Sequence, residues 1–430
     1  MDKWQQKFNK PIFFVTPDIK RGLGLEDLLP QYHLIVSFRD ELIPVLRKKG
    51  VRIFCLGEET GEAILPNNSG RLLDHPQVAR YLAEKGGNKP QIAFFKPSLK
   101  TEMIIRKKGY GIIGTVAELN RELESKLNLP VLLAGFEQYL LDSETGSLSE
   151  FNFARLEAKF GLPLTVQFAF GWAGKNTFFI DTGAQFNKLK NRFPETKVRI
   201  TRKIDALTFL NNCCLYRGRL LIGPPAIQIN GFALLSSNPA ATCGRQWPAS
   251  QLTEEQIKAI KEISETTAKI ISKLGFRGFF GLDFFVEKNS GKVSLSEINP
   301  RLTASSSFYS YLERAVGRIP LLAYHFAEFS GLDLPLPPPG DEAIMGTQLS
   351  LRNRDLINNL KIENEFAVYK YQGKKYKKAR RDYAWEKLAG NELIYLPMPP
   401  GRNSEEWGRI ETKMEAVTDG QLADWVSYLF

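Results

Sequence analysis

The sequence predicts an α/β and α+β protein in three parts: an N-terminal doubly wound parallel sheet domain, a two-lobed central domain and a small C-terminal α+β segment. Three observations lead to this prediction. Short apolar runs alternate with helical patterns over residues 11–150, paired strand-like runs dominate residues 164–301, and the proline-rich stretch 334–340 precedes the last segment. The 430 residues suffice for two to four domains at ~100–200 residues each.

The composition is that of a globular protein, with 43% hydrophobic and 24% charged residues. These values exclude a chain that is disordered, collagen-like or coiled-coil throughout. The formal charge of +11 favours anionic partners such as nucleotides, nucleic acid or carboxylates. The longest uncharged stretch, 220–244, holds three prolines, so a membrane helix is not expected. Without a visible signal peptide, CxxC pair or histidine cluster, we expect a cytoplasmic protein with neither disulfides nor zinc.

Residues 1–150 are interpreted as one accessory α/β domain. Apolar runs bounded by Gly or Pro predict its strands, and amphipathic patterns between them predict its helices. The strands are expected at 11–15, 33–37, 51–56 and 91–95, with helices at 41–49 and 77–85. Such sheets bind ligands beyond the strand ends, but this one carries no GxGxxG fingerprint.

The central domain is expected over residues 151–334, with lobes at about 151–210 and 211–334. A helix at 151–161 is followed by strands at 164–169 and 178–181, so the glycine-containing loop between them closes a hairpin instead of opening a helix. Further strands are expected at 198–204, 208–216 and 219–222. A long helix is expected at 253–274, where Thr253 and Gln256 have the spacing of a capping box.

The most informative stretch predicts a β-hairpin over residues 278–301, with the turn at Asn-Ser-Gly. Counted from Ser290 as the midpoint, Asp283 faces Glu297, and Asn299 shares the face of Glu297. Two facing carboxylates repel each other by ~4 kcal/mol at ~4 Å and an effective dielectric of ~20. Two carboxylates and one amide suit Mg²⁺, which would remove this repulsion.

A structural alternative is that both acids are ordinary strand residues paired with Lys or Arg. A one-residue slip of the hairpin would turn them to opposite faces. Arg301 lies two residues beyond Asn299, where its guanidinium could contact phosphate or carboxylate oxygens.

The hairpin resembles the metal-binding end of the ATP-grasp superfamily, in its carboxylate–amine or peptide ligase-like branch. The resemblance rests on Asp283-Phe284 before the turn and on Glu-Ile-Asn-Pro-Arg at 297–301. It implies ATP and Mg²⁺ as cofactors, with Asp283, Glu297 and Asn299 holding the metal. It also implies that Arg301 is catalytic and contacts the transferred phosphate or the substrate.

The same resemblance implies ATP contacts in the smaller lobe. The loop 171–177 would be a lid over the triphosphate, and Lys203 would lie on the adenine side. Where many members have a phosphate-binding Lys on the strand before the loop, this chain has Gln167, and no acid ends the adenine-side strand. The expected ATP-binding residues are Gln167, Gly171, Gly174, Lys175, Thr177 and Lys203, with Lys175 as a candidate for the missing charge.

The predicted function is an ATP-dependent ligase that activates a small carboxylate as an acyl phosphate and joins it to an amine. The partners are then small-molecule substrates, with neither a membrane nor nucleic acid expected and homo-oligomerisation left open. One alternative is a non-catalytic nucleotide-binding relative, which Gln167 motivates. Another is an RNA- or anion-associated protein that uses the basic, tyrosine-containing strip 370–381 in the segment 341–430.

Two further features, the loop 223–231 and Cys243, have two interpretations each. The uncharged loop 223–231 either walls a substrate pocket or is a buried structural loop. Cys213 and Cys214 are expected in the core, and Cys243 is either a core residue or, less favoured, a nucleophile.

Overall fold

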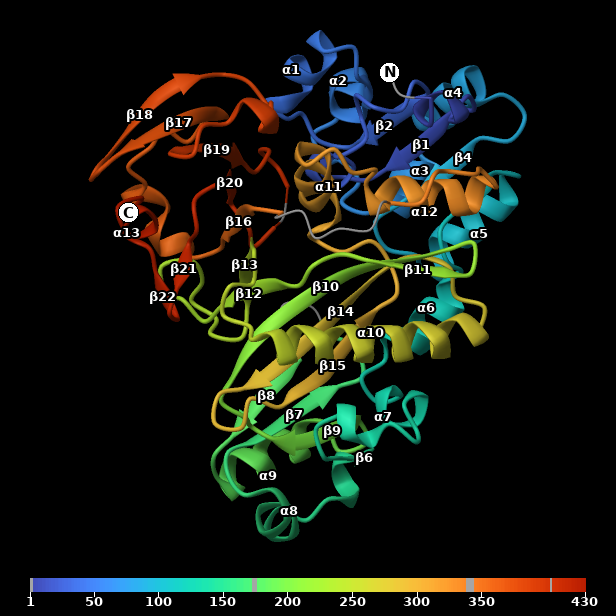
Figure 1. The fold of residues 1–430 in the computed structure, drawn as a ribbon. Helices are drawn as coiled ribbons and strands as arrows, with labels where there is room; N and C mark the ends of the chain where they lie inside the picture. The colour runs from blue at the N-terminus through green and yellow to red at the C-terminus, as the bar shows by residue number, and fades with distance from the viewer. Residues whose placement is uncertain (1–2, 172–175, 338–343, 403) are drawn as a thin grey trace.

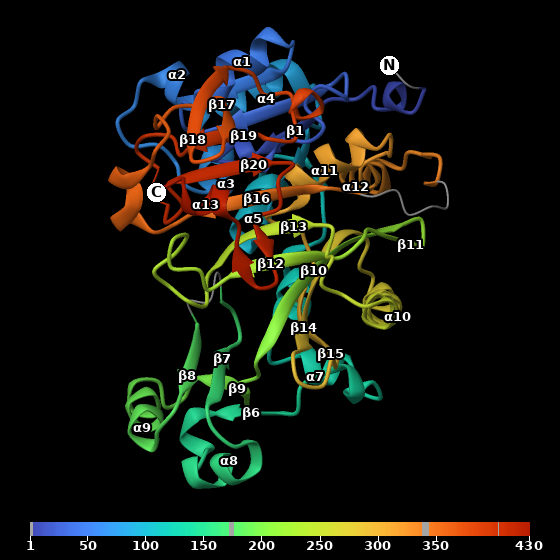
Figure 2. The same ribbon diagram turned by 60° about the vertical axis from the view of Figure 1, so that its left-hand side comes forward.

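The computed structural model describes residues 3–171, 176–337, 344–402 and 404–430, whose arrangement is drawn in Figures 1 and 2. Its strands form a five-stranded, a four-stranded and an eleven-stranded sheet and a short two-stranded ribbon. The four-stranded sheet lies at one end of the molecule, with the five-stranded sheet and the C-terminal strands at the other (Figure 1). None of the helices in the described ranges is long and apolar enough to cross a membrane.

The five-stranded sheet is wholly parallel, in the order β3-β2-β1-β4-β5. All residues of β1 and β2 are buried, which explains why their sequences are apolar without alternation. The order confirms the predicted doubly wound sheet, and its strands are β1 (Ile12–Val15), β2 (Tyr32–Val36), β3 (Arg52–Cys55), β4 (Gln91–Ala93) and β5 (Gly111–Ile113). The strand β5 was not predicted.

Seven short helices belong to this N-terminal region, and a helix begins near each of the two places where one was expected. They are α1 (Leu42–Lys48), α2 (Leu56–Thr60), α3 (Ser69–Asp74), α4 (Pro76–Gly86), α5 (Leu99–Lys107), α6 (Ala117–Glu124) and α7 (Leu129–Leu132). Short 3₁₀ turns also occur along the chain, at η1 (Gln5–Lys7), η2 (Ile19–Arg21), η3 (Glu137–Tyr139), η4 (Leu148–Glu150), η5 (Arg354–Asn359) and η6 (Trp385–Lys387).

The four-stranded sheet is antiparallel and has the order β6-β9-β7-β8. As predicted, β7 and β8 form a hairpin. The elements of this lobe are β6 (Ser143–Ser147), α8 (Phe153–Phe160), β7 (Leu164–Phe168), β8 (Thr177–Ile180), α9 (Gly183–Arg192) and β9 (Lys197–Arg202). The predicted ATP contacts Gly174 and Lys175 lie outside the described residues.

The eleven-stranded sheet runs from the predicted hairpin into the C-terminal segment. Its order is β15-β14-β10-β12-β13-β16-β20-β19-β17-β18, with β11 paired to β10. Its first strands are β10 (Ala206–Tyr216), β11 (Arg219–Ile222), β12 (Ala226–Asn230), β13 (Thr242–Trp247), β14 (Gly278–Glu287) and β15 (Val293–Asn299). The stretch 223–231, expected to be a loop, contains β12 and lies inside this sheet.

Three helices accompany this part of the sheet: α10 (Glu254–Lys273), α11 (Ser306–Ala315) and α12 (Leu321–Ser330). The predicted capping box at the start of α10 is present, with the Thr253 hydroxyl accepting from the Gln256 backbone N–H. The buried side chains of α10 pack on one face of the hairpin, against alternate residues of β14 such as Phe280, Leu282 and Phe284. The opposite face of β14 is therefore free to carry polar side chains.

The C-terminal strands are continuous with the central sheet, because β16 pairs directly with β13 (Figure 2). The remaining elements are β16 (Gly346–Leu351), β17 (Ala367–Gln372), β18 (Lys375–Arg380), β19 (Glu392–Pro397), β20 (Gly408–Thr412), β21 (Val417–Thr418), β22 (Gln421–Leu422) and α13 (Asp424–Ser427). The basic strip 370–381 forms the exposed hairpin β17–β18 at the edge of the sheet.

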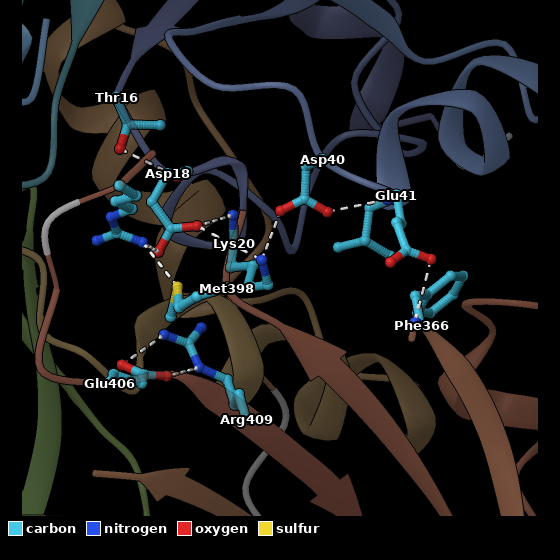
Figure 3. A network of polar contacts seen from close by, with 11 residues as sticks. Thr16, Asp18, Lys20, Asp40, Glu41, Phe366, Met398, Glu406 and Arg409 are labelled. Atoms are coloured by element: carbon cyan, nitrogen blue, oxygen red, sulfur yellow. Dashed lines mark hydrogen bonds and ion pairs between the residues drawn. The ribbon is translucent and has the colours of Figure 1, made fainter. Parts of the chain in front are cut away.

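A buried ionic network joins the N-terminal and C-terminal regions (Figure 3). Asp18 lies 2.5 Å from Arg402, and the neighbouring Lys20 contacts Asp40 at 2.5 Å. The Glu41 carboxylate accepts the backbone N–H of Phe366. The contacts of Asp18 with Arg402 and of Glu41 with Phe366 join chain segments that are hundreds of residues apart in the sequence.

Candidate functional site

A cavity of about 460 Å³ is lined by residues of the four-stranded and eleven-stranded sheets, and by Arg21, Phe95 and Lys126 from the segments around the five-stranded sheet. It collects every predicted site residue in the described part of the chain: Gln167, Gly171, Thr177, Lys203, Asp283, Glu297, Asn299 and Arg301. The predictions came from two separate stretches of sequence, and the fold brings both to one space.

The hairpin β14–β15 places Asp283 directly opposite Glu297 and Gly281 opposite Asn299. Nearer the turn the register is different, because Phe284 pairs with Leu295, so Ser296 is an extra residue that forms a β-bulge. The count from Ser290 therefore gives the right partners at the site but fails between the bulge and the turn.

The bulge decides which face Glu297 occupies. Val293 and Leu295 point into the core under α10, and strict alternation would send Glu297 to that same apolar side. The extra residue Ser296 shifts the alternation by one, so Glu297 and Asn299 line the cavity together with Asp283.

Asp283 has no ion-pair partner among the described residues, and its Oδ2 accepts a hydrogen bond from the Asn299 amide at 3.3 Å. Burial and the facing charge of Glu297 raise the pKa of Asp283 to about 7. A carboxyl group whose pKa is raised by burial and by a facing carboxylate lacks a positive charge that would compensate its own.

Glu297 does have a basic partner, as the structural alternative proposed. Its Oε2 lies 2.8 Å from the ammonium group of Lys126, which is 9% exposed. Lys126 follows α6, and its backbone N–H donates to the carbonyl of Ala169 in the smaller lobe. Nothing in the local sequence indicates this contact, since 171 positions separate the two residues.

The Arg301 guanidinium donates to three acceptors, the side chains of Glu124 and Asn299 and the backbone carbonyl of Leu302. Its Nε donates to Glu124 Oε1 and its Nη2 to Asn299 Oδ1, both at 2.9 Å. Lys96 also contacts Glu124, at 2.7 Å, and the two cations lower the pKa of that carboxyl despite its burial. Arg301 therefore lies beside the predicted metal ligands and connects them to the N-terminal domain.

The residues of the hairpin fit a divalent cation. Asp283 and Glu297 offer oxygens on one face, Asn299 adds an amide oxygen, and Asp283 has no ion-pair partner within the described ranges. The described residues contain no cluster of three or more His, Cys, Asp or Glu side chains that could bind a metal without help. A cation held here would therefore need oxygens from a ligand, as Mg²⁺ takes from phosphates.

Gln167 carries no charge, but its strand partner in the smaller lobe is a buried cation. Arg199 on β9 is the direct partner of Gln167 on β7, is 2% exposed and lines the cavity. Its Nε has no hydrogen-bond partner, and burial lowers its pKa to about 10, so it is protonated at neutral pH. The position of Arg199 beside Gln167 follows from the pairing of β7 with β9, which the sequences of the single strands do not indicate.

The other predicted ATP contacts of this lobe that lie in the described residues, Gly171, Thr177 and Lys203, all border the cavity. Thr177 begins β8, and Lys203, just beyond β9, has its ammonium group 4.7 Å from the centre of the Phe179 ring. Sequence reasoning missed Asn212 on β10, whose Oδ1 accepts from Thr303 and Ser305 at 3.2 and 2.9 Å. The amide nitrogen of Asn212 has no partner and faces the same space.

The structure also decides between the interpretations of the stretch 223–231 and of the cysteines. The strand β12 places Gln228 and Asn230 in the cavity wall, in agreement with the pocket-wall interpretation of 223–231. Cys213 and Cys214 are core residues. Cys243 is fully buried and burial raises its pKa to about 11, which argues against a nucleophile.

Neither a scan against protein-family models nor a search of curated proteins found a match. Solved structures do match. N5-carboxyaminoimidazole synthetase from Staphylococcus aureus, complexed with ADP, has a TM-score of 0.58 at 14% identity, covering 95% of this chain and 94% of that one.

Two carboxylases match equally well. Biotin carboxylase from Campylobacter jejuni has a TM-score of 0.61 at 14% identity, covering 94% of this chain and 87% of that one. The biotin carboxylase domain of Hydrogenobacter thermophilus 2-oxoglutarate carboxylase, bound to MgADP and bicarbonate, has a TM-score of 0.61 at 11% identity, covering 94% and 86%. These likenesses extend over nearly the whole chain, and with the hairpin and the two-lobed cavity they identify the fold of this protein as the ATP-grasp fold.

Proposed function

We propose that this protein is an ATP-dependent ligase that activates a small carboxylate and joins it to an amine. The observation that carries the proposal is the convergence of Asp283, Glu297 and Asn299 on one face of a hairpin, in a cavity shared with the smaller lobe. Solved neighbours that contain ADP, MgADP or ATP support the choice of nucleotide.

In the first step, a substrate carboxylate oxygen attacks the γ-phosphorus of ATP. An O–P bond forms, the bond to the bridging oxygen breaks, and ADP leaves. Mg²⁺, when bound by Asp283, Glu297 and Asn299, supplies charge neutralisation for the phosphates. The buried guanidinium of Arg199 and the ammonium of Lys126 add positive charge along the same wall, where phosphoryl transfer depends on positioning and electrostatics.

In the second step, the amine nitrogen attacks the carbonyl carbon of the acyl phosphate. A C–N bond forms, inorganic phosphate leaves with the electrons of the C–O bond, and the amine proton passes to solvent or to a base. Arg301 lies beside Asn299 and can donate hydrogen bonds to the acyl phosphate oxygens. The acyl phosphate has to be kept from water until the amine attacks, because water would hydrolyse it.

A second candidate is a carboxylase in which bicarbonate is the acid that is activated. The neighbours support it, since they include a synthetase of a carboxyamino compound and a carboxylase bound to bicarbonate. The chemistry at the γ-phosphorus is the same, so one assay can separate the two candidates by the acid that is consumed.

The test is a screen for phosphate release with Mg-ATP, small acids including bicarbonate, and a panel of amines. We expect phosphate release that requires one of the added acids as substrate. Its rate should fall at least ~100-fold in Glu297→Gln, since a ligand to the metal is lost. Glu262→Gln, the same change on the exposed side of α10, should keep full activity. Full metal-dependent turnover by Glu297→Gln would refute the site, and nucleotide binding without turnover of any acid would favour the non-catalytic alternative.

A further inference from the structure

A second group of charges lines the cavity, away from the smaller lobe. It consists of Arg21 after β1, Arg245 on β13, Arg352 after β16 and Arg409 on β20. These residues come from the N-terminal domain, the central strands and the C-terminal strands. Local sequence patterns therefore give no sign of the cluster.

Some cations in this region already have carboxylate partners. Arg409 donates to Glu406 through Nε at 2.8 Å and Nη2 at 3.3 Å, and Arg402 contacts Asp18 (Figure 3). Arg409 is therefore committed to the structural network that joins the two ends of the chain, and is not free to bind a ligand.

The other three arginines, Arg21, Arg245 and Arg352, each have a buried nitrogen without a hydrogen-bond partner in the described ranges. Within the described ranges, Arg21 and Arg245 form no ion pair, and buried nitrogens of both lack a hydrogen-bond partner: Nη1 of Arg21 and Nε of Arg245. Arg245 is 5% exposed and donates from Nη1 to the neutral side chain of Gln348, at 2.8 Å. Arg352 also has an unpartnered Nε, and its contact with Glu405 is long, at 3.6 Å.

The arginines also repel each other. Burial, and then the charge of Arg409, lower the pKa of Arg21 to about 9, although the carboxylates of Glu406 and Asp18 oppose this shift. Burial, Arg409 and Arg352 together lower the pKa of Arg245 to about 10. Both remain charged at neutral pH, so the fold keeps unpaired, mutually repelling cations around an open cavity. Buried charges of this kind require a counter-charge, and an anion in the cavity would supply it.

The cluster lies within reach of the reaction centre. Arg245 is the direct strand partner of Gln228, and β12 and β10 separate its strand from the strand of Asp283. Three spacings of ~4.8 Å put about 14 Å between the two strands, and the charge of Asp283 is near enough to oppose the lowering of the Arg245 pKa. A molecule of a few carbon atoms can then span from the metal ligands to the arginines.

We propose that Arg21, Arg245 and Arg352 bind a second oxyanion, a carboxylate or phosphate group, on the small-molecule substrate whose other end lies at the metal ligands. This rests on the proposed function and narrows it to a dianionic substrate. Guanidinium groups bind both kinds of oxyanion through paired N–H donors, so carboxylate and phosphate share this chemistry.

Calorimetry with the full chain, at fixed ionic strength and without nucleotide, tests the proposal. The ligands are succinate, phosphoglycolate and inorganic phosphate, with propionate as the monoanion. We expect at least one of succinate and phosphoglycolate to bind at least ~10-fold tighter than propionate, since each added charge-assisted contact contributes. Preference for succinate identifies a dicarboxylate, and preference for phosphoglycolate identifies a phosphorylated acid.

Arg21→Gln and Arg245→Gln should each weaken binding of that dianion about 10- to 100-fold. Lys377→Gln, an equal charge change on the exposed strand β18, should not weaken it. Should Arg245→Gln fail to fold, Arg245→Lys and Arg352→Gln serve in its place, with an expected loss of at least ~5-fold. Propionate binding as tightly as both dianions, or dianion binding unchanged in every arginine variant, would overturn the proposal.

The two proposals fail separately. Dianion binding that depends on the arginines, without any ATP turnover, would preserve the anion site and refute the ligase. Phosphate release that requires Glu297, but with a monoanionic acid as the best substrate, would preserve the ligase and refute the anion site.

Discussion

At the scale of single residues, the site is defined by charges that the fold leaves uncompensated. Asp283 faces Glu297 across two strands, and in the part of the chain that the structure describes only Glu297 has a basic partner. Arg199 and Arg245 are buried cations that lack carboxylate partners in the described ranges. Such arrangements lower stability, and they are typical of positions selected for binding or catalysis.

Replacing Asp283 by Asn should therefore stabilise the metal-free protein while abolishing activity. The free carboxyl group has a pKa of 3.8, but the folded protein raises it to about 7, so folding loses stability as the pH rises from about 4 to 7. We expect a higher melting temperature for Asp283→Asn than for wild type at pH 8 in EDTA, with no gain near pH 4. A lower melting temperature at pH 8 would contradict this account.

The buried His325 should make the protein sensitive to acid. Its Nδ1 accepts the backbone N–H of Phe279 at 2.9 Å, and burial lowers its pKa from 6.5 to about 3. The unfolded chain therefore binds a proton between these values and the folded chain does not, so stability is lost as the pH falls below about 6.5. Urea unfolding should lose roughly 2 kcal/mol between pH 7.5 and 5.0 through this group.

In the variant His325→Asn this part of the pH dependence should disappear, because the amide oxygen can still accept the N–H but does not titrate in this range. The matched variant His75→Asn keeps His325 and should keep the loss. An unchanged slope in His325→Asn would assign the acid sensitivity to other groups.

At the scale of elements, the hairpin β14–β15 depends on how its first strand begins. Gly275 and Gly278 both have φ of +86°, a conformation that costs other residues about 1–2 kcal/mol. A Cβ on Gly278 would lie 2.5 Å from His325 Nδ1 and 2.6 Å from Phe329, whereas a Cβ on Gly275 would meet nothing within 4 Å. The two glycines therefore separate backbone strain from crowding.

Gly275→Ala should lower the free energy of unfolding by about 1–2 kcal/mol, through strain alone. Gly278→Ala should lower it by a further ~1–3 kcal/mol, because the helix α12 must move to admit the methyl group. Chemical denaturation of both variants measures the difference. Equal losses would mean that α12 accommodates the methyl group without cost.

At the scale of the whole molecule, the cavity exists because distant parts of the chain are held together. The network of Asp18, Lys20 and Arg402 fixes the N-terminal region against the C-terminal strands (Figure 3). Burial opposes the charge of Asp18, but Arg402 and Lys20 outweigh it and hold its pKa far below the usual range. This interface positions Arg21 and Arg409 on the cavity wall.

Asp18→Asn should destabilise the protein by about 3–5 kcal/mol, since it leaves buried cations without their anion. Asp18→Asn combined with Arg402→Gln should recover part of this loss. A double-mutant cycle by thermal unfolding measures the coupling between the two residues. Additive losses would mean that the pair does not hold the regions together.

Sequence patterns alone determined much of this protein. The order of strands and helices in the N-terminal domain, the hairpin at 278–301 and the pairing of Asp283 with Glu297 follow from local apolar periodicity, glycine positions and one short motif. Local interactions decide these features, so a local reading can find them.

Only the tertiary structure decided which charges surround the hairpin. Lys126, Arg199, Arg21 and Arg245 come from strands and loops that are far apart in sequence, and strand pairing and domain contact bring them to the cavity. The continuity of β13 with β16 is also decided by pairing across distant segments. Side chains that meet through long-range packing leave no periodic trace in the sequence, and for that reason the cations around the hairpin were found only in three dimensions.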